Sequence, residues 1–205
     1  MKRLVNASIS SSDRKRAYMD ITPPEELSRL ADSSDKDVRE AVASNPTTPP
    51  NVLTKLASDE NGYVRWAVAE NPNTPVKVLR ELVRNADPNK GEDLNVLQGV
   101  ASNPSTPVKL LEKLMNPNMD TYVRNEALRN PSIPPELLTK LANEGDIDTR
   151  EYVARHPNTP LDVVEKLFFD PEDEHGLLKY YVGENPNVSF DTYQKWYRKF
   201  RDTKN

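Results

Sequence analysis

One basic residue recurs at the same place in successive segments of this 205-residue chain. A guanidinium group binds a carboxylate or a phosphate through two parallel hydrogen bonds, so such a row could contact an acidic partner along a surface. In the alternative, the row is an internal ladder in which each side chain bonds the neighbouring segment. Both interpretations stay open for the row, which is broken at Leu97 and consists of Arg39, Arg65, Arg124, Arg150 and Lys179.

The residue that follows this basic position changes type from one segment to the next. Repeat proteins set their binding specificity by such variation on a constant frame, and tryptophan often anchors protein interfaces. A partly buried packing role is the alternative for Trp66. We predict that a partner contacts Arg39, Arg65, Trp66, Arg124, Arg150, Lys179 and Tyr180.

Side chains that could perform catalysis or bind a metal are scarce. The chain has no cysteine and two histidines, His156 and His175, so zinc and iron–sulfur sites lack ligands. Asp146 and Asp148 could act as a general acid and base, but both lie where a helix is expected to start, and aspartate is common there as a cap. We therefore predict no enzyme activity, no metal and no cofactor.

These positions are carried by a repeat with a proline-containing joint. Asn-Pro-x-Thr-Pro occupies residues 45–49, 71–75 and 103–107, with variants at Asn130, His156 and Asn185. Successive joints lie about 26 to 32 residues apart, which indicates six units and a terminal fragment. We expect the asparagine amides to bond neighbouring turns, with a strip for ligand binding as the alternative. His156 is interpreted as a turn residue in the same row.

Each unit is predicted to contain two helices. The first helix is expected to begin at the joint, where Thr should cap it and Pro should take the first helical position. Val52, Leu53 and Leu56 illustrate its apolar stripe. A shorter second helix follows, and Glu126 at its small-residue position should disturb the fourth unit. The predicted fold class is all-α, a HEAT-like α-solenoid of about six two-helix repeats.

Two segments resemble a known family closely. VREAVASNPTTP at 38–49 and VRWAVAENPNTP at 64–75, each followed by Leu-x-x-Leu-Ala or a close variant, resemble the leucine-rich repeat variant family of bacterial proteins. The resemblance covers roughly residues 22–188. It implies a right-handed superhelix of α-helices alternating with short 3₁₀-like helices, and a bacterial or phage origin. The units here are slightly longer than the family's short repeat, which leaves open whether the second helix is 3₁₀ or α. The family's described member has a cysteine-rich cluster-binding segment, which this chain lacks, so no redox role is carried over.

Charge and composition suggest three regions. The formal net charge is +4 for residues 1–19 and +3 for residues 189–205. Because the whole chain carries −4, residues 20–188 carry a net charge of −11. We predict an N-terminal basic segment or cap at 1–19, a solenoid at 20–188, and an aromatic and basic capping helix at 189–205. The capping helix should place Phe190, Tyr193, Tyr197 and Phe200 near one face, although such a helix could instead bind nucleic acid or a membrane surface.

The favoured function is a non-catalytic scaffold that binds a protein, such as a basic segment that complements the acidic repeats. The alternative is nucleic-acid binding through the Arg row and the basic ends, which the acidic body disfavours because such binding depends on neutralising phosphates. No apolar run is long enough to span a membrane, and the first residues contain no signal-peptide core. We therefore expect a cytoplasmic protein.

Overall fold

The computed structural model describes residues 11–19, 21–173 and 175–202, and within these ranges it contains helices and no strands. The predicted all-α class is confirmed. Contacts between residues divide the chain into two units, Met1–Asn130 (unit 1) and Pro131–Asn205 (unit 2), and each is described by itself. The division at 1–19, 20–188 and 189–205 stays a prediction.

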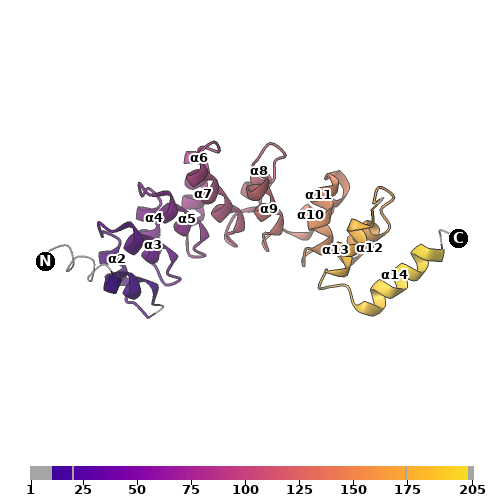
Figure 1. Ribbon diagram of the computed structural model, residues 1–205, viewed down its shortest axis with the longest axis horizontal. Coiled ribbons are helices and arrows are strands. Elements are labelled where there is room, and N and C mark those ends of the chain that lie inside the picture. Colours follow the sequence, from indigo (N-terminus) through magenta and orange to yellow (C-terminus); the bar gives the residue numbers. More distant parts are fainter. Residues whose placement is uncertain (1–10, 20, 174, 203–205) are drawn as a thin grey trace. The chain divides into compact units, whose positions relative to one another are not determined.

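Each repeat contributes a first and a second helix, and the pairs follow one another along the chain (Figure 1). The first helices are α2 (Pro24–Leu30), α4 (Pro50–Leu56), α6 (Val76–Asn85), α8 (Val108–Leu114), α10 (Pro135–Glu144) and α12 (Leu161–Phe168). The second helices are α3 (Lys36–Ser44), α5 (Gly62–Glu70), α7 (Gly91–Ser102), α9 (Thr121–Arg129), α11 (Ile147–Arg155) and α13 (Leu177–Gly183). Residues 11–18 form a further helix before this series, and α14 (Phe190–Asp202) follows it.

Within the residues described the second helices are α-helices, so of the two possibilities left open by the sequence, 3₁₀ and α, the structure shows the α form. Most of them span nine residues and begin at an Asx cap. Asp35 Oδ1 accepts from the Asp37 N–H at 2.9 Å, and Asn61 Oδ1 accepts from the Tyr63 N–H at 3.0 Å. These caps satisfy N–H groups that have no partner within the helix, and two full turns of α-helix can then form.

The threonine of the joint has a different role from the predicted one. Proline occupies the cap position of the first helices, and no side chain caps them. The Thr hydroxyl instead donates backwards to the end of the preceding second helix: Thr48 Oγ1 to the Val42 carbonyl at 2.6 Å, and Thr74 Oγ1 to the Val68 carbonyl at 2.5 Å. The threonine therefore closes one helix instead of opening the next, because the proline after it already starts the following turn.

The core of unit 1 is built from both helices of each repeat. The second helices pack in chain order, α3 on α5, α5 on α7 and α7 on α9. Val38 and Val64 are fully buried among them, as are Leu53 and Leu79 of the first helices. The predicted apolar stripes are thus confirmed, and neighbouring repeats share one buried seam in this unit.

A ladder of asparagines joins successive turns. Asn71 Nδ2 donates to the carbonyls of Ala43 and Asn45 in the previous turn, at 2.7 and 2.8 Å, and its Oδ1 accepts from the Asn73 N–H at 2.9 Å. Asn103 repeats the first pair with Ala69 and Asn71, across the longer third repeat. These amides are buried and linked to backbone, so the expectation that they bond neighbouring turns is confirmed.

His156 continues this row in unit 2. It is buried, and its Nδ1 accepts from the Asn158 N–H at 3.1 Å, as an asparagine Oδ1 does elsewhere. Asn185 in the next turn donates to the carbonyls of Ala154 and His156, at 2.7 and 3.1 Å. His156 is therefore the turn residue that the spacing predicted.

Glu126 was expected to disturb the fourth repeat, but it does not. The helix α9 runs without a break from Thr121 to Arg129, and Glu126 forms an ion pair with Arg129 at 3.0 Å. A larger side chain fits at this helix position because it extends towards solvent beside a partner one turn away.

The helix α14 covers the end of α12 within unit 2. Phe168 is fully buried, and its ring lies 5.5 Å from Tyr193, 5.7 Å from Trp196 and 6.3 Å from Phe200. Phe190 and Tyr197, predicted to share the packed face, are 75% and 50% exposed. The packed face is therefore centred on Trp196, because residues 193, 196 and 200 follow helical spacing more closely.

Candidate partner-binding surface

The predicted basic row lies on the second helices, where acids of the protein bind the charges of Arg39, Arg65, Arg150 and Lys179. Arg39 donates from Nε and Nη2 to Asp59 at 2.6 and 2.9 Å, and from Nη1 to the Ser33 carbonyl at 2.9 Å. Arg65 donates from Nη2 to Asp93 Oδ1 at 2.8 Å. Both acids belong to the following repeat, so each pair bridges adjacent repeats.

In unit 2, Arg150 also bridges to the following repeat, whereas Lys179 pairs with an acid of its own repeat. Arg150 donates to Asp170 Oδ2 at 2.8 Å and to Glu172 Oε2 at 2.5 Å. Lys179 donates to Asp173 Oδ2 at 2.8 Å and lies 4.6 Å from the Phe200 ring centre. The acidic residues between α12 and α13 therefore supply partners for the basic row in this unit. This pairing was not predicted from the sequence.

Burial sets the electrostatics of these pairs. The side chains of Arg39, Arg65, Arg150 and Lys179 are 11% to 21% exposed. Burial opposes the ionisation of Asp59, but hydrogen bonds from Arg39 and the Asn61 N–H outweigh it and hold the pKa of Asp59 below its usual value. Asp173 has a lowered pKa for the same reason, with Lys179 as the donor. Arg124 occupies the equivalent position on α9 and is half-buried. This geometry matches the internal ladder.

Trp66 has a different environment from the arginines. It lies on α5, half-buried, and a Cβ added to Gly99 on α7 would lie 2.9 Å from its Cδ1 atom. The ring thus packs over the glycine while part of it stays at the surface. At this position of the second helices, Gly99 is the smallest residue in the series. A glycine there was the sequence signal that a large side chain packs against it.

Unit 1 presents further aromatic side chains beside Trp66. Tyr63, one turn earlier on α5, is 46% exposed, and Tyr122 at the equivalent position of α9 is 72% exposed. We call the residues Tyr63, Trp66, Glu70, Tyr122 and Glu126 the Trp66 face. Because α5, α7 and α9 pack in succession, these side chains belong to one surface of unit 1.

In unit 2 the corresponding helices present tyrosines and an arginine. Tyr180 is 61% exposed, and its ring lies 5.3 Å from Tyr181. A hydrogen bond to Glu184 raises the pKa of Tyr180. Arg155 lies over the rings of Tyr152 and Tyr181, at 4.4 and 4.9 Å from their centres. These residues stabilise one another by cation–π contacts.

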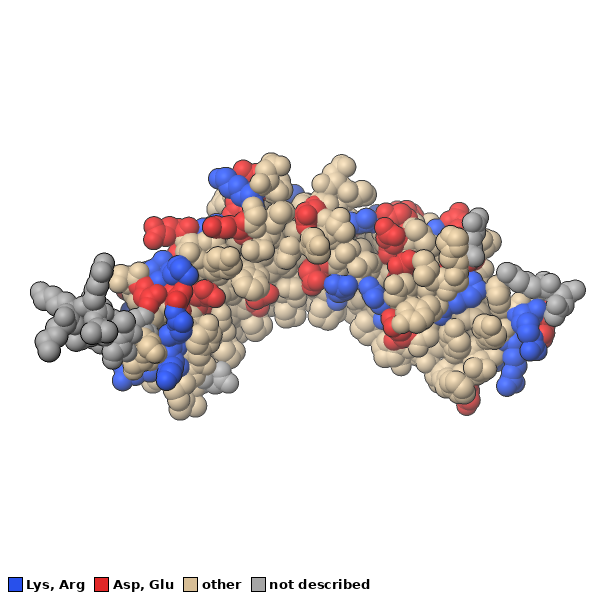
Figure 2. All heavy atoms as spheres, in the orientation of Figure 1, with Lys and Arg blue, Asp and Glu red and all other residues tan. Residues whose placement is uncertain are grey.

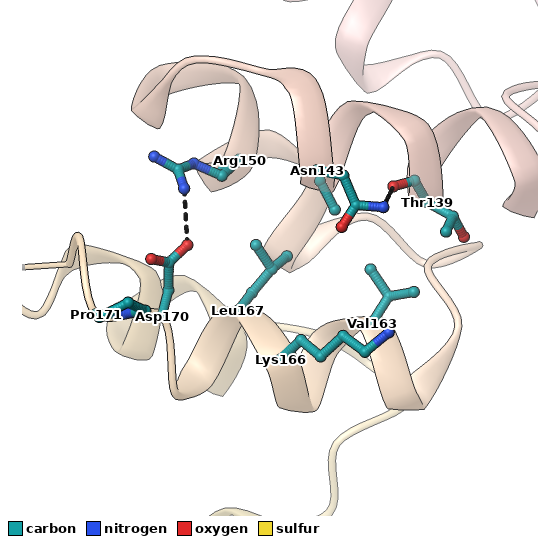
Figure 3. Close-up of a pocket in the computed structure, with 9 residues that line it drawn as sticks. Thr139, Asn143, Arg150, Val163, Lys166, Leu167, Asp170 and Pro171 are labelled. Atoms are coloured by element: carbon teal, nitrogen blue, oxygen red, sulfur yellow. Dashed lines mark hydrogen bonds and ion pairs between the residues drawn. The ribbon is translucent and has the colours of Figure 1, made fainter.

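A pocket of about 240 Å³ lies in unit 2 between α10 and α12 (Figure 3). The side chains of Asn143, Val163, Lys166 and Leu167 line it, and the ion pair of Arg150 with Asp170 forms one end. Asn143 donates to the Thr139 carbonyl at 2.9 Å. The polar groups at the pocket are largely engaged in holding the repeat.

The outer side of α14 carries basic side chains, which gather at this helix in Figure 2. Lys195 and Arg198 line an open depression there together with Phe190. On the packed side, Lys199 lies 4.8 Å from the Phe169 ring centre and 3.7 Å from Glu165. One of the basic residues of this helix therefore also secures the cap.

Asp146, one of the two acids considered for catalysis, has a structural role. Asp146 Oδ1 accepts from the Thr149 N–H at 2.8 Å and caps α11. The part of the chain that the structure describes holds no group of three or more His, Asp or Glu side chains placed for a metal ion. In the same residues, no helix is both long and apolar enough to cross a membrane.

Comparison with known proteins gives two similarities. The sequence model of the family described as leucine rich repeat variant matches residues 37–61. A solved structure, described as a leucine-rich repeat variant with a novel repetitive protein structural motif, is similar over 79% of this chain, with a TM-score of 0.50 and 21% sequence identity. The similar region covers 61% of that protein. No curated protein sequence matches significantly.

Proposed function

Given that this chain is a helical-repeat protein with repeats of the leucine-rich repeat variant kind, we propose that it is a non-catalytic scaffold that binds a protein partner. The surface that contacts the partner is the Trp66 face of unit 1. Tyr180 on unit 2 is a second contact. The five basic residues of the row act on binding through the frame that they stabilise.

The observation that carries this proposal is the exposure of large aromatic side chains on second helices. The buried faces of these helices repeat the same residue type, valine. Tyr122 is 72% exposed and Tyr63 is 46% exposed, while Val64 and Val123 on the same helices are fully buried. Aromatic residues supply much of the binding energy in protein interfaces, and exposed rings contribute nothing to the core. Nucleic-acid binding is less supported, because acids of the chain already occupy most of the basic row.

The proposal is tested by a photo-crosslinking amino acid placed at Tyr122 in one variant and at Lys109 in another. Lys109 is an exposed residue on the first helix of the same repeat. In a lysate of the source cell, position 122 should yield a defined crosslinked protein that position 109 does not. Trp66→Ala in the first variant should abolish this product. Absence of any product specific to position 122 would remove the proposed function.

A further inference from the structure

Glu70 lies at the end of α5, one helical turn after Trp66. Partial burial of the carboxylate is the largest influence and raises the pKa of Glu70; the nearby indole N–H of Trp66 opposes this, and the negative charge of Glu126 raises the pKa further. Together these environments leave the negative charge of Glu70 poorly compensated.

Several other acids on the second helices of unit 1 have a cation beside them. Asp37 pairs with Lys36 at 2.7 Å, and Glu126 pairs with Arg129 at 3.0 Å. Glu70 has no ion pair with any residue in the described ranges. It is thus an acid at the surface, with its carboxylate partly buried next to an indole and with lone pairs available for another donor.

Gly99 explains how these groups come together. A Cβ at this position would lie 2.9 Å from Trp66 Cδ1 and 3.2 Å from Glu70 Cγ, so both side chains rest against the backbone of α7. The helix α7 packs on α5 and also on α9, which carries Glu126. Because position 99 has no side chain, nothing at this position separates Glu70 from Glu126.

We propose that Trp66, Glu70 and Glu126 bind a lysine or arginine side chain of an extended basic segment in the partner. This inference rests on the proposed function and names the chemistry of the partner. The cation lies against the Trp66 ring and donates to Glu70, while the Glu126 carboxylate, which also pairs with Arg129, contributes to the negative potential. Tyr63 and Tyr122 contact the apolar stems of neighbouring residues of the segment.

Charge complementarity selects this occupant over others. An indole face attracts a cation, and the attraction increases when the cation is desolvated. A carboxylate provides a charge-assisted hydrogen bond to an ammonium or guanidinium group. Residues 20–188 carry a net charge of −11 by formal count, which draws a basic segment towards the repeats. The same charges repel the phosphates of nucleic acids and anionic lipids.

The two tryptophans of the chain allow a direct test. Trp66 and Trp196 give two indole N–H signals in a ¹H–¹⁵N NMR spectrum of the labelled full-length protein. The probes are an eight-residue peptide with alternating arginine and serine, its glutamine-for-arginine analogue, and a single-stranded oligonucleotide. The arginine peptide should shift the Trp66 signal saturably and leave the buried Trp196 signal in place. The other two probes should shift neither signal.

Glu70→Gln and Glu112→Gln form a matched pair of variants. Both remove one negative charge, but Glu112 is exposed on α8, away from the Trp66 face. Loss of a hydrogen bond to a charged group should lower the affinity for the arginine peptide about tenfold in Glu70→Gln. In Glu112→Gln the affinity should change less than twofold. Urea unfolding verifies the fold of both, and Glu70→Gln should be at least as stable as wild type, since it relieves the repulsion from Glu126.

An unchanged Trp66 signal with the arginine peptide, or equal weakening of binding in both variants, would overturn the inference. A shift produced equally by the glutamine analogue, or by the oligonucleotide, would also do so because it assigns the face to different chemistry. The proposed function is judged separately. If position 122 yields a crosslinked product but the arginine peptide does not shift the Trp66 signal, the proposed scaffold function stands and the basic partner is refuted.

Discussion

The asparagine ladder predicts a large loss of stability from one small substitution, Asn71→Ala. The Asn71 side chain is 3% exposed and makes three hydrogen bonds, two as donor to Ala43 and Asn45 and one as acceptor from Asn73. Each such bond contributes about 1 kcal/mol, and a buried group left without a partner costs about 1–3 kcal/mol. We therefore expect Asn71→Ala to lower the free energy of unfolding by about 3 kcal/mol.

Asn73→Ala is the matched control in the same turn. Its side chain is exposed and donates only to the Pro46 carbonyl, so its loss should cost about 1 kcal/mol or less. The assay is urea unfolding followed by circular dichroism. With a urea slope of about 2 kcal/mol/M, the midpoint should fall by about 1.5 M for Asn71→Ala. Midpoints that agree within about 0.3 M for the two variants would refute a stabilising role for the ladder.

Three further predictions concern separate contacts. Because the pKa of Asp59 is lowered in the fold, its ionised form stabilises the protein at pH values above its unfolded pKa of about 3.9, and this contribution is lost as pH falls through the lower folded pKa. Asp59→Asn removes the carboxylate that pairs with Arg39, so it should lower the urea midpoint at pH 7. The midpoint of this variant should also fall less steeply with decreasing pH than that of wild type. Gly99→Ala, normally favourable in a helix by up to about 1 kcal/mol, should instead lower the melting temperature and shift the Trp66 indole signal, because the new methyl group meets that ring; an increase would contradict the packing described. Phe168→Ala should cost about 3–5 kcal/mol and shift the fluorescence of the α14 tryptophan to longer wavelength, and an unchanged spectrum would show that α14 docks without this ring.

Local chemistry was sufficient to predict the repeat and its helices. The Asn-Pro joints end the second helices at Ser44 and Glu70, and the apolar spacing identified the residues that fill the core. The direction of the threonine bond was wrong, because a hydroxyl near two helix ends can serve either one. Only the turn geometry decides that Thr48 donates to Val42.

The candidate site was harder to predict because it depends on contacts between repeats. Arg39 and Asp59 are twenty residues apart, whereas Arg65 reaches Asp93 in the lengthened third repeat, so no single spacing reveals the pairing. Trp66 was identified from its variable position. Its neighbour Glu70 was not, because the effect of Gly99 on both side chains follows from how α5 and α7 approach each other.

The joints also determine how such a protein can be altered in length. Asn103 makes the same pair of bonds to the preceding turn as Asn71 does, although its repeat contains additional residues, which lengthen α6 and α7 relative to α4 and α5. Extra residues are thus absorbed where they do not change the link between turns. A whole module excised or duplicated at the Asn-Pro boundary would keep its donors and acceptors matched, so genetic recombination at these boundaries could exchange recognition cassettes without redesigning their neighbours.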